Sequence, residues 1–160
     1  MNGNILTLEY TIMEWKAKVN KMSENSIVPC NIKFFDIIEH FDKTNMVVWK
    51  RTSAIKKGDY VYIYIGKPYG EIKYKCEVVI DKVENKMIEN NQYAITPNSV
   101  KNHQRYVQMK LIGKYPDKCI TLSKLRLAGL GQVQIQARTD RKVQAALDEI
   151  DMNYMIKIND

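Results

Sequence analysis

The stretch from Ser53 to Val79 constrains the fold of this chain most, because two strand-like runs flank a tight turn there. The polar turn Lys56–Asp59 leads into the apolar, aromatic-rich run Tyr60–Ile65. Five turn-forming residues, Gly66–Gly70, then lead into Ile72–Val79, in which polar and apolar residues alternate. This order predicts a β-hairpin. Aromatic and cationic side chains share the hairpin, and this combination suits stacking on a ring and neutralising a phosphate.

The composition is that of a folded and basic protein. Hydrophobic residues make up 45% and charged residues 27% of the 160 residues, and the net charge is +7. A chain of this length forms one domain, or one domain with an arm. The positive charge favours an anionic partner such as nucleic acid, although a solvated lysine-rich surface would give the same charge.

Cysteine and histidine usage predicts neither a disulfide framework nor a metal site, and nothing in the sequence calls for a cofactor. Three cysteines stand singly and two histidines lie far apart, at Cys30, Cys76, Cys119, His40 and His103. This spacing fits neither paired cysteines nor a zinc site. The sequence also lacks a signal-peptide pattern and the run of about 20 apolar residues that a membrane helix needs. We therefore expect a cytoplasmic location and no membrane partner.

The rest of the chain predicts an α+β domain with a mostly antiparallel, curled sheet. Leu8–Met22 carries apolar residues at helical spacing and predicts an arm that packs on the domain or on a partner. Further strands are predicted at Ile27–Cys30, Met46–Lys50 and Arg105–Ile112, and short helices at Asn31–Phe41, from Thr121 onward and at Val143–Ile150. Asp81–Asn102 is polar and irregular, which is typical of a long surface connection.

Asn31–Phe41 predicts a helix of about three turns. Asn31 is a favourable N-cap residue. Phe34, Ile37, Ile38 and Phe41 have the i, i+3, i+4, i+7 spacing of an apolar helical stripe.

Several strings of this sequence together resemble the bacterial EVE-domain proteins of the PUA-like superfamily. They are IVPCNIKFFDII, Trp49-Lys50, IKKGDYVYIYIGKPYGEIKYKCEV, RYVQMKLIGKYP, LSKLRLAGL and GQVQIQAR, and they lie between Ile27 and Ile150. The GDYVYIYIG string followed by YKCEV is the specific part of the match.

The resemblance implies both a fold and a function. The fold is a curled, mixed and mostly antiparallel β pseudo-barrel flanked by short helices, related to YTH and ASCH domains. It would occupy residues 26–160, with residues 1–25 as a helical arm and linker. The implied function is non-catalytic nucleic-acid binding, in which a modified base is flipped into a pocket, often in proteins associated with restriction or defence.

A base pocket needs flat apolar walls and a few directed hydrogen bonds. Trp49 is the candidate wall, although a core position at the end of a strand explains it equally well. Asn31 offers a donor and an acceptor to a base edge, or serves only as the helix cap. The predicted base pocket comprises Asn31, Trp49, Tyr64, Gly66 and Tyr69.

Cations near these residues are the predicted phosphate contacts. Lys50 and Arg51 directly follow the candidate wall. Lys73 and Lys75 are two residues apart on a strand and therefore share one face, although such a face is often only solvated. The predicted phosphate contacts are Lys50, Arg51, Lys67, Lys73 and Arg138.

Three other functions remain open at this point. Asp59, followed by Glu71-Ile72-Lys73, imitates the order of acids and lysine in metal-dependent nucleases, although its turn alone explains Asp59. LSKLRLAGLGQVQIQAR imitates a helix-turn-helix, but its second half alternates like a strand. A protein-interaction domain or homodimer would use Leu8–Met22. The sequence indicates neither the base modification nor whether DNA or RNA is bound.

Overall fold

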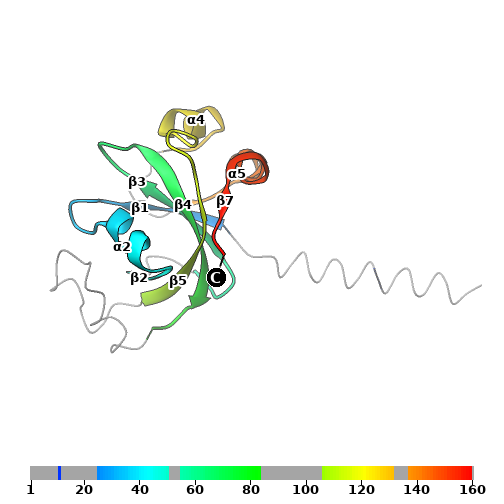
Figure 1. Ribbon diagram of the computed structural model, residues 1–160. Helices are drawn as coiled ribbons and strands as arrows, with labels where there is room; N and C mark the ends of the chain where they lie inside the picture. The colour runs from blue at the N-terminus through cyan, green and yellow to red at the C-terminus, as the bar shows by residue number, and fades with distance from the viewer. Residues whose placement is uncertain (1–10, 12–24, 51–54, 84–105, 132–136, 160) are drawn as a thin grey trace, which may run out of the picture.

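The predicted hairpin consists of β3 (Tyr60–Ile65) and β4 (Glu71–Ile80), and it lies in the middle of the sheet (Figure 1). The structure, a computed structural model, describes residues 11, 25–50, 55–83, 106–131 and 137–159. Within them, seven strands form one sheet in the order β2-β5-β4-β3-β1-β6, and β7 pairs with β5. One pairing, between β1 and β3, is parallel and the others are antiparallel. The predicted mixed, mostly antiparallel sheet is confirmed, although it does not close into a barrel.

The other three predicted strands are also present. In β5, Val107, Met109 and Leu111 are buried, as the alternation predicts. The strands outside the hairpin are β1 (Asn25–Cys30), β2 (Met46–Lys50), β5 (Tyr106–Lys114), β6 (Ala137–Arg138) and β7 (Ile156–Lys157). The predicted arm Leu8–Met22 and most of the predicted connection Asp81–Asn102 lie outside the described residues.

Two helices near the carboxyl end agree with the sequence pattern. In α4 (Leu122–Leu127), the Thr121 side chain caps the helix by accepting a hydrogen bond from Lys124 N at 3.3 Å. Gly129 has φ +105° just after this helix, a conformation that costs glycine little. The last helix, α5 (Arg141–Tyr154), is longer than the predicted Val143–Ile150. In the described part of the chain, no helix has the length and apolarity to cross a membrane.

The helix predicted from Asn31 begins later than expected. It is α2 (Ile37–Lys43), and its N-cap is Asp36, whose Oδ1 accepts from Glu39 N at 3.0 Å. Asn31 instead closes a turn, since its Oδ1 accepts from Lys33 N at 3.0 Å. The prediction of a three-turn helix capped by Asn31 is therefore wrong. Phe34 belongs to this turn and is 58% exposed, so it does not join the predicted helical stripe.

Hydrophobic side chains cover both faces of the sheet. The main core lies between the sheet and α2; the second core lies under α4 and α5 (Figure 1). The two faces follow from the alternation along β3, because Val61, Ile63 and Ile65 join the main core while Tyr62 and Tyr64 join the second.

A β-bulge near the turn of the hairpin interrupts this alternation on β4. Ile63 pairs with Tyr74 and Tyr64 pairs with Ile72, so Lys73 is the extra residue. Consequently Ile72 packs in the second core and Tyr74 in the main core, although they are two residues apart. The expectation that Lys73 and Lys75 simply share one strand face therefore does not apply at this position.

Candidate nucleic-acid interface

The parallel pairing of β1 and β3 brings several predicted site residues to one end of the sheet. Cys30 pairs with Ile65, so the segments that follow both strands start side by side. Gly66 N donates to Cys30 O at 3.2 Å, which places Gly66 beside the residue that precedes Asn31. In open α/β sheets, ligands bind outside the carboxyl ends of parallel strands, and this one parallel pair offers an edge of the same kind. Asn31 and Gly66 are thus brought together as predicted for one site.

The loop after β1 carries exposed and aromatic side chains. Asn31 is exposed, and its carbonyl oxygen accepts from Phe34 N and Phe35 N at 2.9 and 3.1 Å. The Phe35 ring lies edge-on to Trp49, with centroids 6.0 Å apart. Phe35 therefore links the Asn31 turn to Trp49. The sequence reading missed Phe34 as a surface aromatic, because its spacing from Ile37 imitated a helical stripe.

Trp49 occupies an intermediate position between core and surface. It lies on β2, which is an edge of the sheet, and it packs against the main core while remaining half-buried. Lys50 follows it and is exposed, whereas Arg51 lies outside the described residues. The indole is neither sealed in the core nor fully solvated, so a role in packing and a role as a wall are compatible.

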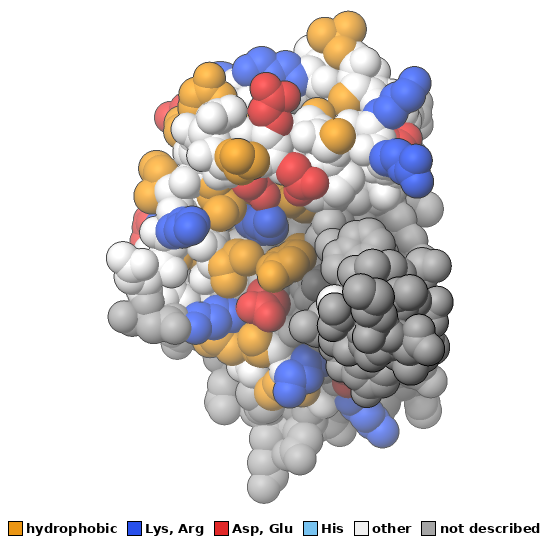
Figure 2. Space-filling model, turned by 90° about the vertical axis from the view of Figure 1, so that its right-hand side faces the viewer, with side chains coloured by type: hydrophobic (Ala, Val, Ile, Leu, Met, Phe, Trp, Pro, Cys, Tyr) orange, Lys and Arg blue, Asp and Glu red, His pale blue; other side chains and the backbone are white. Residues whose placement is uncertain are grey.

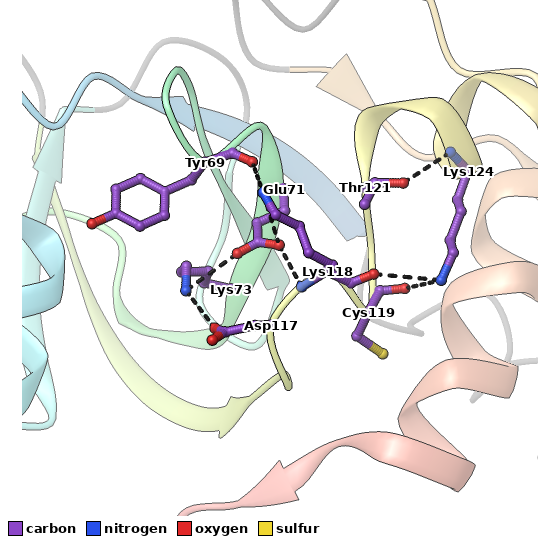
Figure 3. Close-up of polar contacts among 8 residues, drawn as sticks. All are labelled: Tyr69, Glu71, Lys73, Asp117, Lys118, Cys119, Thr121 and Lys124. Carbon is purple, nitrogen blue, oxygen red and sulfur yellow. Dashed lines mark hydrogen bonds and ion pairs between the residues drawn. The ribbon is translucent and has the colours of Figure 1, made fainter.

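Tyr69 belongs to the hairpin tip, Gly66–Gly70, and is held there by contacts with several residues. Gly66 O accepts from Tyr69 N at 3.0 Å, and Lys118 Nζ donates to Tyr69 O at 2.6 Å (Figure 3). Lys73 Nζ lies 5.0 Å from the centroid of the Tyr69 ring, which is half-buried against the main core. Lys67 is exposed at the same tip. The tip thus presents one fixed aromatic ring close to cations.

Two predicted site residues do not belong to this surface. Tyr64 is buried in the second core, on the face opposite Trp49, and its hydroxyl lies 3.9 Å from where a Cβ on Gly70 would stand. Tyr64 therefore supports the tip from beneath. Arg138 lies in β6 opposite Ser26, near the start of β1, whereas Asn31 follows the end of that strand.

A polar cluster stands behind the tip and joins it to the loop that follows β5 (Figure 3). Glu71, with 2% of its side chain exposed, accepts from Lys118 N at 2.6 Å and pairs with Lys73 Nζ at 3.2 Å. Lys73 Nζ also pairs with Asp117 Oδ1 at 2.9 Å. Burial by itself lowers the pKa of Lys73, but the hydrogen bonds to Asp117 and Glu71 outweigh burial and raise it. The hydrogen bond to Lys73 in turn lowers the pKa of Asp117.

This geometry contradicts the nuclease arrangement. Asp59 accepts from Lys56 N at 2.8 Å in its turn and lies opposite Val78, while Glu71 lies opposite Ile65 at the other end of the hairpin. The two acids therefore cannot hold one metal ion. Among the described residues, no group of three His, Cys, Asp or Glu side chains is arranged to hold a metal. The buried Glu71 carboxylate serves to anchor the loop after β5.

The helix-turn-helix reading also lacks support. The helix α4 ends at Leu127, and Ala137–Arg138 is a strand that pairs with β1. The intervening residues 132–136 lie outside the described part of the chain.

A second polar cluster, centred on Asp151 of α5, lies on the other face of the sheet. Asp151 accepts hydrogen bonds from Lys75 Nζ at 2.6 Å, from Tyr62 OH at 3.2 Å and from Tyr115 OH. Lys75 Nζ also lies over the Tyr60 and Tyr62 rings, 4.7 and 5.2 Å from their centroids. Burial raises the pKa of Tyr62 to about 12, so its hydroxyl stays a donor. This cluster fastens α5 to the sheet, and it engages the ammonium of Lys75, the lysine expected to share a strand face with Lys73.

Solved structures show which fold this is. No protein-family model and no curated protein matches the chain in sequence. A point mutant of the ASCH protein from Zymomonas mobilis superposes with a TM-score of 0.60 at 13% identity, covering 79% of this chain and 96% of that one. A hypothetical protein from Leishmania major gives 0.54 at 14% identity, covering 82% and 96%, and a protein from Pseudomonas syringae gives 0.54 at 12%, covering 79% and 98%. The chain therefore shares its fold with these structures, among them the Zymomonas mobilis ASCH protein.

Proposed function

We propose that this chain is a non-catalytic nucleic-acid-binding module that holds one unpaired base at the carboxyl ends of β1 and β3. The observation that carries the proposal is that Asn31, Gly66 and Tyr69 converge there, beside the exposed ring of Phe34. The PUA-like fold and the net charge of +7 support an anionic ligand of this kind. From the sequence resemblance we further propose that the chain is of the EVE type within that superfamily.

Aromatic stacking and one directed amide would supply the base recognition. Every base has a flat face, so stacking on Phe34, Trp49 or Tyr69 contributes about 1–3 kcal/mol per base without demanding a sequence. Asn31 offers an amide that can donate to and accept from a base edge. A modification on the base would be distinguished by how it alters these few contacts.

Cations on the same elements would neutralise the flanking phosphates. Lys50 is exposed next to Trp49, and Lys67 is exposed next to the tip that holds Tyr69. Arg51, which follows Lys50, is proposed for the same role. Arg138 pairs with the start of β1, and a β-strand rises about 3.3 Å per residue. Arg138 would therefore contact a bound oligonucleotide only if the oligonucleotide is several nucleotides long.

The experiment is a fluorescence-anisotropy titration of the full chain with labelled single-stranded and duplex oligonucleotides of DNA and RNA, each with one altered base. We expect saturable binding to single-stranded oligonucleotides. The logarithm of the binding constant should fall linearly as the logarithm of the salt concentration rises. A preferred altered base identifies the modification. No saturable binding of any oligonucleotide at low salt, or binding that ignores salt, would contradict the proposal.

A second candidate function is a protein-interaction or dimerisation domain, which a different observation favours. Large apolar side chains are exposed on the carboxyl-terminal helices and on β7; they are Leu127, Met152, Tyr154 and Ile156. Figure 2 views the molecule from the right-hand side of Figure 1 and shows hydrophobic side chains exposed among charged ones. A contact surface would bury such side chains if they form one contiguous patch. The mass in solution, by light scattering, with and without residues 1–22, would show whether the chain self-associates.

A further inference from the structure

Lys73 has two carboxylate partners, one of which is buried and the other exposed. Glu71 is buried and also accepts the Lys118 main-chain N–H, so its pairing with Lys73 is part of the fold. Asp117 lies 2.9 Å from the same ammonium, but 86% of its side chain is exposed. Asp117 thus approaches Lys73 from the solvent side, while Glu71 approaches it from within.

The contact with Asp117 is the exchangeable one. Ion pairs at the protein surface add little to stability and are screened by salt, and Asp117 is the surface member of this pair, in which 16% of the Lys73 side chain is exposed. Breaking the pairing with buried Glu71 would instead leave a desolvated charge without its partner. A second anion arriving from solvent can therefore take the place of Asp117 without disturbing Glu71.

We propose that Asp117 occupies a phosphate-binding position at Lys73 and is displaced when a nucleic-acid phosphate binds there. This inference rests on the proposed nucleic-acid function and deepens it. Lys73 Nζ lies 5.0 Å from the centroid of the Tyr69 ring, so a phosphate at this ammonium would adjoin a base stacked at the tip. Lys118, whose Nζ donates to Tyr69 O, supplies a second cation nearby.

The charges of the cluster fit this exchange. Glu71 and Asp117 balance Lys73 and Lys118, and displacement of Asp117 leaves one positive charge for the phosphate. A phosphate oxygen accepts the same charge-assisted hydrogen bond that the carboxylate gives up. Because every ligand must first displace Asp117, the position disfavours isolated anions and favours a phosphate that is attached to a stacked base.

The test compares oligonucleotide affinities of matched charge variants, with a fluorescein-labelled single-stranded 12-mer as the probe. We expect Asp117→Asn to bind about two- to fivefold more tightly than the native chain, as removal of an exposed competing ion pair predicts. The control is Glu149→Gln, which removes one exposed negative charge from α5 and should change the affinity much less.

Lys73 is tested in a background that spares the fold. Lys73→Met alone leaves Glu71 buried without its ion pair, so we use Glu71→Gln with Lys73→Met, in which the glutamine oxygen can still accept from Lys118 N. In this background, Asp117→Asn should no longer tighten binding. A gain that persists there, or one no larger than that of Glu149→Gln, would overturn the inference.

A second probe separates this inference from the proposed function. Inorganic tripolyphosphate is titrated while the Lys118 backbone amide is followed by NMR. If it shifts this amide more strongly in Asp117→Asn while no oligonucleotide binds, the phosphate position stands and the proposed function fails. If oligonucleotides bind equally well to the native chain and to Asp117→Asn, the proposed function stands and the inference fails. If neither probe binds even Asp117→Asn, in which the competing carboxylate is gone, both are wrong.

Discussion

Lys73 and Lys75 lie two residues apart on β4 and meet the same kinds of neighbour, yet they belong to different regions of the molecule. Each binds an aspartate, at 2.9 and 2.6 Å, and each lies over a tyrosine ring. The aspartates differ, because Asp117 is 86% exposed on a loop and Asp151 is 12% exposed on a packed helix. Chemically similar side chains therefore form an open end near the hairpin tip and a closed, helix-covered face.

The difference teaches that the covering element, and not the residue types, decides whether the carboxylate partner of a lysine is exposed or buried. At the closed face, hydroxyls of Tyr62 and Tyr115 and the ammonium of Lys75 all converge on Asp151. At the open end, the Asn31 side chain accepts only a local turn hydrogen bond among the contacts described, and Phe34 is exposed. Exposure of the carboxylate is the feature that separates a structural ion pair from an exchangeable one.

The largest expected effect is at the closed face. Asp151→Ala leaves Lys75 mostly buried without its carboxylate and removes the acceptor of two tyrosine hydroxyls. We expect the free energy of unfolding to fall by about 3 kcal/mol, the scale for breaking a buried pair. Urea denaturation measures it. Asp117→Ala is the control and should leave stability unchanged within error. Equal losses in the two variants would show that the two ion pairs do not differ in their contribution to stability.

At the open end, Trp49→Ala should weaken oligonucleotide binding by about 1–3 kcal/mol, because a stacking surface is lost. Stability should also fall, since the indole packs against the main core. Anisotropy titrations at a temperature where both proteins are folded separate the two effects. Native-like affinity in this variant would remove Trp49 from the base site.

Phe34→Ala isolates binding from packing at the same end. The ring is 58% exposed, so we expect no change in the unfolding midpoint and a loss of about 1 kcal/mol in oligonucleotide affinity. Leu127→Ala, at an exposed position on α4, is the matched control and should change neither quantity. A lower midpoint with unchanged affinity would assign Phe34 to the fold.

The smallest effect concerns the pH dependence of stability and comes from α2 at the open end. Burial lowers the pKa of His40 below its ordinary 6.5, against the hydrogen bond with Met46 O. The unfolded chain therefore binds a proton more readily than the folded protein. The stability that neutral His40 contributes is fully present above pH 6.5 and decreases as the pH falls below that value. Raised pKa values keep Lys75 and Tyr62 at the closed face protonated throughout.

Urea denaturation at about pH 7.5 and about pH 5.5 checks this sign. His40→Gln keeps a side chain that can donate to Met46 O without titrating, so its stability should change less between the two pH values. An equal or larger change in the variant would show that other groups govern the pH dependence.

Elements that depend on nearby residues could be predicted from the sequence. The hairpin follows from turn residues between alternating runs, and the α4 cap follows from Thr121 before an apolar run. The start of α2 could not be predicted, since Asn31 and Asp36 are both good caps and the turn at residues 32–34 favours the second. Phe34 was consequently placed in the helical stripe by its spacing alone.

Of the candidate site, the sequence predicted the residue types and only part of the grouping. Asn31 and Gly66 come together because β1 and β3 pair in parallel, a contact across 35 residues that no local pattern specifies. Tyr64 and Arg138 were predicted for the same site, but strand alternation buries Tyr64 beneath the tip and strand pairing puts Arg138 near the start of β1.

The sequence by itself determined the sheet-rich α+β fold, the central hairpin and a surplus of positive charge, since propensity, alternation and composition act over a few residues or over the whole chain. Only the tertiary structure decided which lysine has an exposed carboxylate partner and which a buried one. The partners of Lys73 and Lys75, Asp117 and Asp151, lie 44 and 76 residues away, and their exposure is set by the loop and the helix that carry them.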